Sequence, residues 1–122
     1  MARQTIVLDA NALVAYYKNE PGANRVRDTL RMAARGELTL LMTVVNAGEV
    51  LVALERAGGA EASHRTLEAL QELPVRLVNV DLELSARAAW CKVGGGIAYA
   101  DAFAIALAHR EGVPVVTGDR KF

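Results

Sequence analysis

Four short apolar runs, separated by segments of helical length, constrain the fold of this chain more than any other feature. The runs cover residues 5–8, 38–42, 75–80 and 113–116. Strands that are apolar along their length are typical of sheets covered on both faces. Strands that alternate with helices form parallel sheets with helices on either side. The sequence therefore predicts an α/β fold with a central parallel sheet.

Capping residues and glycines mark the ends of the intervening helices. Thr43 and Asp81 are good N-caps, whereas Gly36 and the pair Gly58-Gly59 are stop signals. Gly94-Gly95-Gly96 reads as a flexible break. Helices are expected over residues 12–17, 22–35, 44–56, 61–72, 82–92 and 99–110.

Length and composition indicate a single domain over residues 1–122. A hydrophobic fraction of 52% with 23% charged residues excludes intrinsic disorder. The single cysteine excludes an intrachain disulfide and a cysteine zinc site. Without a signal-peptide pattern or an apolar run of about 18 residues, we expect a cytoplasmic protein that does not cross a membrane. Basic and acidic residues balance at 14 each, so any site for a polyanion must be local.

Four acidic residues occupy unusual positions. Asp9 follows the first predicted strand and Asp119 follows the last. Glu49 and Asp101 lie in helices that are apolar on nearly all sides, which predicts that both helices are buried. Each acid alone has a structural explanation, as a helix cap, a salt-bridge partner, a helix N-terminal charge or a turn residue.

Taken together, the four acids favour a metal site. Parallel strands place their carboxyl ends at one edge of the sheet, so the acids can converge there. Carboxylates without a matching buried cation repel each other, and oxygen ligands select hard ions such as Mg²⁺ or Mn²⁺. Such a site activates water and neutralises a phosphodiester. Asn11 and Thr117, each two residues from an acid, are candidate ligands of water or phosphate oxygens.

The chain resembles the PIN-domain ribonucleases, above all the VapC-type toxins of toxin–antitoxin pairs. The similarity covers nearly the whole chain and rests on four motifs: VLDAN, NAGEV, YADAFAIALA and VVTGD. It implies a three-layer α/β/α sandwich with strand order 3-2-1-4-5, a homodimer and a small antitoxin partner. Family members usually continue past the Gly-Asp segment into an edge strand, so we expect four to five strands. The resemblance implies that four acids bind the Mg²⁺ or Mn²⁺ ions that cleave RNA: Asp9, Glu49, Asp101 and Asp119.

Several basic residues are candidate contacts for RNA or for an acidic antitoxin segment. Arg27, Arg31 and Arg35 recur every four residues and form one stripe on a helix. A solvated helix face explains this stripe, and contact with phosphates is the alternative. Arg120 and Lys121 adjoin Asp119, within reach of an incoming phosphate.

Two other functions fit part of the pattern. An aspartate-nucleophile phosphatase of the haloacid dehalogenase type also has an acid after its first strand. It needs a second acid two residues later, where this chain has Asn11. A PIN-like module that only binds a partner is the non-enzymatic alternative, and loss of the acids would support it. Because all four acids are present, we predict a metal-dependent endoribonuclease.

Overall fold

The computed structural model describes residues 4–117 of the chain. Over these residues the chain forms, in order, β1 (Gln4–Leu8), α1 (Ala10–Lys18), α2 (Ala23–Ala34), β2 (Leu38–Thr43), α3 (Val44–Glu72), β3 (Arg76–Val78), α4 (Leu82–Gly95), α5 (Tyr99–Glu111) and β4 (Val115–Val116).

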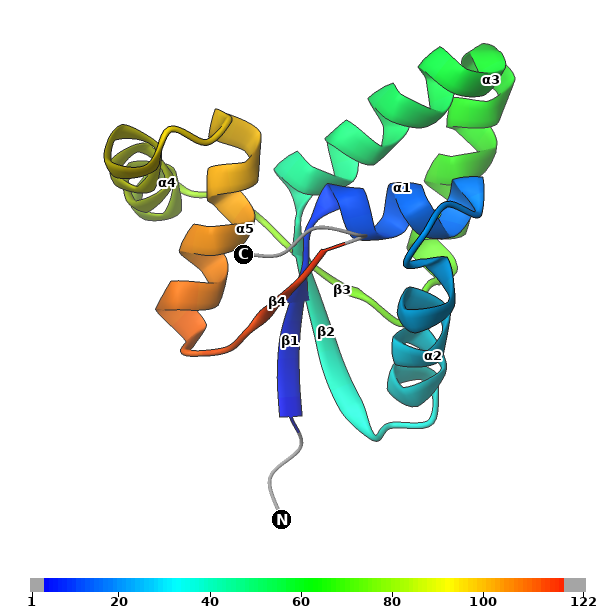
Figure 1. Ribbon diagram of the computed structural model, residues 1–122, viewed down its shortest axis with the longest axis horizontal. Helices are drawn as coiled ribbons and strands as arrows, with labels where there is room; N and C mark the ends of the chain where they lie inside the picture. Colours follow the sequence, from blue (N-terminus) through cyan, green and yellow to red (C-terminus); the bar gives the residue numbers. More distant parts are fainter. Residues whose placement is uncertain (1–3, 118–122) are drawn as a thin grey trace.

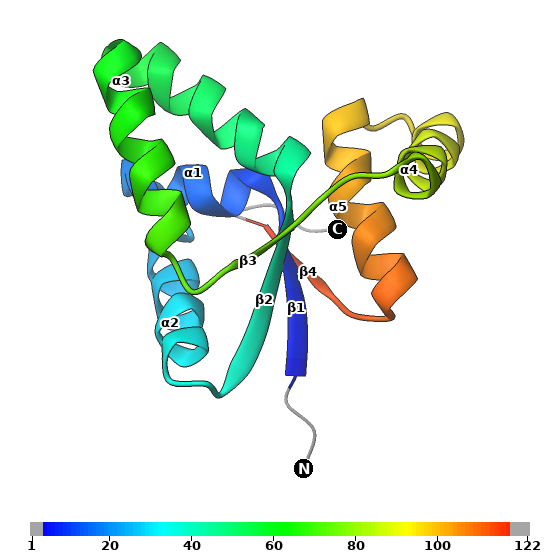
Figure 2. The same cartoon turned by 180° about the vertical axis from the view of Figure 1, so that it is seen from behind.

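The strands form a parallel sheet in the order β3-β2-β1-β4. Helices α1, α2 and α3 lie on one side of this sheet, and α4 and α5 lie on the other (Figures 1 and 2). The predicted three-layer α/β/α sandwich is therefore confirmed, as is the order of its first four strands. A fifth strand after β4 falls outside the described residues.

The two central strands are apolar because each contributes side chains to two cores. From β1, Ile6 and Leu8 pack in the core beneath α1, α2 and α3, whereas Val7 packs in the core beneath α4 and α5. Strand β2 divides its side chains in the same way, with Leu40 and Leu41 in opposite cores. Successive strand side chains point to opposite faces, so a strand covered on both faces has no polar position.

The two outer strands of the described sheet are shorter than predicted. Strand β3 covers Arg76–Val78 instead of residues 75–80, and β4 covers Val115–Val116 instead of residues 113–116. Each pairs with a neighbour on one side only within the described residues. Strand β3 ends where its partner ends, because Val78 pairs with Thr43 and α3 begins at Val44. Pro114 still contacts β1, since its carbonyl accepts a hydrogen bond of 2.9 Å from Val7 N, but the ladder itself covers only Val115–Val116.

Helix α3 bends sharply at Gly59, where the sequence predicted two separate helices. Gly59 has φ 87° and ψ 178°, which essentially only glycine adopts without strain. The two arms of α3 diverge from this point in Figure 1. The prediction that the first arm is buried all round was wrong, since Val44 is 38% and Val52 is 49% exposed. Helix α3 as a whole packs against α1, α5, β2 and β3, and the side of its first arm that carries Val44 and Val52 is left uncovered.

The structure confirms the predicted start of α4 and corrects its predicted end. The hydrogen bond from Leu84 N to Asp81 Oδ1, 2.9 Å long, confirms the predicted N-cap. The predicted break at the three glycines was wrong in part, because α4 continues through Gly95 and ends at Gly96 with φ 70°. Within residues 4–117, no single helix is long and apolar enough to cross a bilayer. Helices α4 and α5 are long and apolar enough only when they are taken together, and the chain bends by 114° between them.

Candidate active site

Asp9 joins the end of β1 to the start of α1. Its side chain is 1% exposed. One carboxylate oxygen, Oδ1, accepts a hydrogen bond of 2.9 Å from Ala12 N and so caps α1. The other oxygen, Oδ2, is buried and has no hydrogen-bond partner. The capping role therefore occupies one oxygen and leaves the second available to a ligand.

The surroundings of Asp9 disfavour its charge. Burial raises the pKa of the Asp9 carboxyl to about 6, against the opposing effect of the Ala12 hydrogen bond. The negative charges of Asp101 and Glu49 also raise this pKa, and the value of about 6 includes their effect. These charge effects link Asp9, which follows β1, with Glu49 on α3 and Asp101 on α5. A buried carboxylate in such a place requires a cation or a proton.

Glu49 lies on the first arm of α3 and is half-buried. Its Oε1 accepts a hydrogen bond of 3.1 Å from Asn46 Nδ2. Burial raises the pKa of Glu49, the Asn46 hydrogen bond lowers it, and the charge of Asp101 raises it again. Glu49 is therefore placed by α3 and restrained by its neighbour one turn earlier.

Asn46 is a site residue that the sequence analysis missed. It is fully buried, and its Oδ1 accepts a hydrogen bond of 2.6 Å from Thr43 Oγ1. Its Nδ2 donates both to Glu49 and to the carbonyl of Ala100, at 3.0 Å. Asn46 thus ties α3 to the first turn of α5, directly before Asp101. The available signal was a polar residue one helical turn before Glu49 within an apolar segment.

Asp101 stands in the first turn of α5, half-buried. The helix N-terminus favours an anion at this position. Its charge acts on both Asp9 and Glu49, and the joint binding of a metal by these three acids stays a prediction. Asp119 lies outside the described residues, as do Arg120 and Lys121.

The donor set fits a hard divalent cation. In the part of the chain that the structure describes, no three acidic, histidine or cysteine side chains are already gathered at metal-binding distances. Mg²⁺ does not require such a cage, because it keeps several waters and commonly takes one or two carboxylates. The unpartnered Oδ2 of Asp9 is the atom that such an ion would satisfy.

The predicted supporting residues, Asn11 and Thr117, differ in exposure. Asn11 is exposed and lines a groove of about 270 Å³ together with Glu49. Thr117 is 3% exposed, and its carbonyl accepts a hydrogen bond of 2.8 Å from Arg25 Nη2 on α2. Arg25 was not predicted, because nothing local distinguishes it from the other arginines of that helix.

Arg27 and Arg31 of the predicted arginine stripe lie on α2, and Arg35 is the C-cap of that helix. Arg27 forms an ion pair of 3.4 Å with Asp28, and Arg35 forms one of 3.0 Å with Glu37. Both pairs are at the surface, in keeping with a solvated helix face. Contact of this stripe, including Arg31, with RNA or an antitoxin stays a prediction.

Solved structures share this fold. VapC20 from Mycobacterium tuberculosis, a sarcin-ricin loop cleaving toxin, has a TM-score of 0.72 at 18% identity, covering 93% of this chain and 91% of that one. VapBC2 from Rickettsia felis, bound to a DNA fragment from its promoter, has a TM-score of 0.71 at 14% identity, covering 93% and 86%. A toxin-antitoxin complex from Klebsiella pneumoniae has a TM-score of 0.66 at 17% identity, covering 92% and 84%.

The sequence gives a family assignment that agrees with this fold. A search with the sequence against curated proteins finds no match. At the identities above, the structural similarity establishes the fold alone. The family model described as the PIN domain matches residues 6–122, which is nearly the whole chain. The chain belongs to the PIN domain family.

Proposed function

We propose that this protein is an endoribonuclease that depends on Mg²⁺ or Mn²⁺ and serves as the toxin of a toxin–antitoxin pair. The observation that carries the proposal is the buried Asp9 carboxylate, which has one oxygen without a hydrogen-bond partner. The negative charges of Glu49 and Asp101 raise the pKa of this carboxyl. Membership of the PIN domain family supports nuclease chemistry. Structural neighbours that are toxins, or toxins with antitoxins, support the biological role.

Each residue of such a site would have a distinct role. The metal would be held by Asp9, Glu49, Asp101 and, as a prediction, Asp119. When bound, a divalent cation lowers the pKa of water and neutralises the phosphodiester during in-line attack. Ala12 N–H holds one oxygen of Asp9 and so leaves the other for the ion. Asn46 restrains Glu49 beside the first turn of α5.

A cleavage assay with labelled RNA tests the proposal. We expect cleavage with Mg²⁺ or Mn²⁺, products with 5′-phosphate and 3′-hydroxyl ends, and no cleavage in excess chelator. Asp101→Asn should abolish cleavage. Asp81→Asn, which alters an N-cap on α4 in place of a site acid, should leave it unchanged.

Three results would contradict the proposal in different ways. Unchanged cleavage in excess chelator would overturn the metal mechanism. Hydrolysis of a small phosphomonoester without cleavage of RNA would favour the aspartate-nucleophile phosphatase. Binding of a partner without any hydrolysis would favour a non-catalytic PIN-like module.

The proposal includes a small antitoxin, a homodimer and a cytoplasmic location, where cellular RNA is the substrate. An antitoxin gene beside the gene for this protein would support the toxin role. For the homodimer, the support is an exposed apolar stripe on α4. It consists of Leu82 (85% exposed), Trp90 (71%) and Val93 (87%).

A further inference from the structure

A groove of about 270 Å³ runs between α1 and α3 and includes Glu49. Helix α1 contributes Asn11 and Val14, and α3 contributes Val52 and Arg56 beside Glu49. The groove therefore has a candidate catalytic acid and an arginine in the same lining, with apolar side chains between them.

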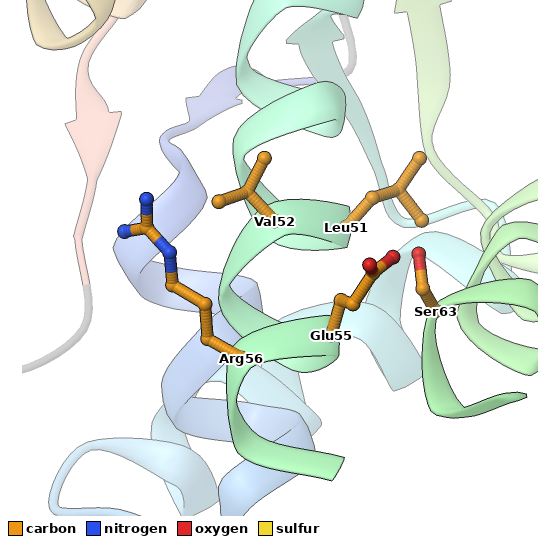
Figure 3. A pocket seen from close by; sticks show the side chains of 5 residues that line it. All are labelled: Leu51, Val52, Glu55, Arg56 and Ser63. Carbon is orange, nitrogen blue, oxygen red and sulfur yellow. The ribbon is translucent and has the colours of Figure 1, made fainter. Parts of the chain in front are cut away.

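Arg56 is available to a ligand. It is exposed, and within residues 4–117 no acidic side chain forms an ion pair with it. Within the described residues the adjacent Glu55 forms no ion pair with Arg56, although both side chains line a second pocket beside α3. Figure 3 shows Glu55 directed toward Ser63 on the second arm and Arg56 directed away from it.

The position of Arg56 relative to Glu49 follows from helix geometry. Seven residues make nearly two turns, so both side chains leave the same face of α3, about 10 Å apart along its axis. Side chains in a helix lean toward its N-terminus. In Figure 3 the Arg56 side chain extends along α3 toward the turn of Val52, which is the direction of Glu49.

We propose that Arg56 binds a phosphate of the RNA strand next to the phosphate held at the acids. This subsite rests on the proposed ribonuclease function. One end of the groove has the acids, where a divalent cation would bind one phosphate, and the other end has the Arg56 guanidinium. Apolar side chains lie between them, an arrangement that suits two nearby phosphates joined by a nucleoside. A guanidinium binds phosphate oxygens through paired, charge-assisted hydrogen bonds. Val14 and Val52 supply the apolar contact for the ribose or base.

Binding of labelled single-stranded RNA in chelator, measured by fluorescence anisotropy over a range of salt concentrations, tests this subsite without cleavage. Arg56→Ala should weaken binding about tenfold at low salt. It should also reduce the slope of log affinity against log salt by about 0.7, the value for one phosphate contact on a single strand. Arg56→Lys should recover part of the affinity. The matched control is Arg76→Ala, an exposed arginine on β3 that does not line the groove, and it should change affinity less than about twofold.

Cleavage kinetics in Mg²⁺ supply a second measurement. Arg56→Ala should raise KM and leave kcat within about threefold, because the lost contact is made before and during the reaction alike. Equal losses for Arg56→Ala and Arg76→Ala would overturn the subsite, since general charge would then explain both. So would an Arg56→Ala variant that binds RNA normally and loses affinity only for a glutamate-rich peptide, which would make the groove a protein site.

The outcomes for the subsite and for the ribonuclease are separable. Wild-type protein that cleaves RNA, with Arg56→Ala binding RNA equally well, would reject the subsite and leave the ribonuclease in place. Wild-type protein that neither binds nor cleaves RNA in Mg²⁺ would reject both.

Discussion

At the scale of single residues, Asp9 combines a capping bond with a buried, unpartnered oxygen. Its pKa rises from 3.8 to about 6 on folding, chiefly through burial. A carboxyl with a raised folded pKa stabilises the fold fully below its unfolded value, and this contribution is lost as the pH rises through the folded value. The metal-free protein should therefore lose about 3 kcal/mol of stability from this group as the pH rises from well below 4 to well above 6.

Asp9→Asn tests that pH dependence. The amide oxygen can still accept the bond from Ala12 N, but the buried charge is gone. In chelator at pH 7, we expect stability equal to the wild type or higher by up to about 3 kcal/mol, with a smaller difference at pH 4. Denaturant melts from pH 4 to pH 8 measure it, and Asp81→Asn reports what replacing a capping carboxylate does by itself. A variant clearly less stable than the wild type at pH 7 would show that the Asp9 charge has a partner in the fold.

Asn46 should act on the site by positioning Glu49. Asn46→Ala removes hydrogen bonds to Thr43, Glu49 and the Ala100 carbonyl, and should destabilise the protein by about 2–3 kcal/mol. We also expect at least a tenfold loss of cleavage and a smaller rise in melting temperature on addition of Mg²⁺, since an unrestrained Glu49 binds the ion less well.

The control for Asn46 is Thr66→Val, on the second arm of α3. Thr66 is 6% exposed and donates a hydrogen bond of 2.8 Å to the carbonyl of Ala62. Its loss should cost about 1 kcal/mol and leave the response to Mg²⁺ intact. If both variants responded to Mg²⁺ like the wild type, Asn46 would be a structural residue alone.

At the scale of elements, the bend of α3 depends on Gly59. A side chain there would be strained at φ 87° even though no atom lies within 4 Å of the added Cβ. Gly59→Ala should therefore destabilise the protein by about 1–3 kcal/mol. Gly94→Ala, in the helical part of α4 where a Cβ also meets no atom within 4 Å, should be neutral or stabilising by up to about 1 kcal/mol.

Thermal or urea denaturation of these two glycine variants measures the difference. A Gly59→Ala variant as stable as the wild type would mean that α3 can pass this point with ordinary backbone angles. The bend would then be a property of packing and not of the glycine.

At the scale of the whole molecule, the stripe on α4 predicts how two copies associate. Its three members lie within about 80° of one another around the helix, as their spacing in sequence requires. Sedimentation should show a dimer at micromolar concentration, and Trp90→Ser with Val93→Ser should shift it toward monomer without unfolding it, because both side chains are exposed. Leu67→Ser, at a 45% exposed leucine on α3, should leave the dimer intact. A wild-type protein that sediments as a monomer would contradict the homodimer.

The sequence by itself determined the kinds of elements and most of their ends. Apolar runs, the N-caps Thr43 and Asp81 and the glycine stops act through residues within about four positions, so they can be read locally. The fold followed from these signals, and the predicted meeting of the acids followed from the rule that parallel strands share an edge. The family resemblance added the metal and the reaction.

The tertiary structure decided what depends on residues far apart in the chain. Asn46 donates a hydrogen bond to the carbonyl of Ala100, which lies 54 positions later in the chain. Arg25 donates one to the carbonyl of Thr117, which lies 92 positions later. The exposure of Val52 and the groove beside Arg56 depend on which side of α3 meets α1 and the sheet. Local sequence cannot specify such contacts, because they form only when separate elements pack and bury one another's polar groups.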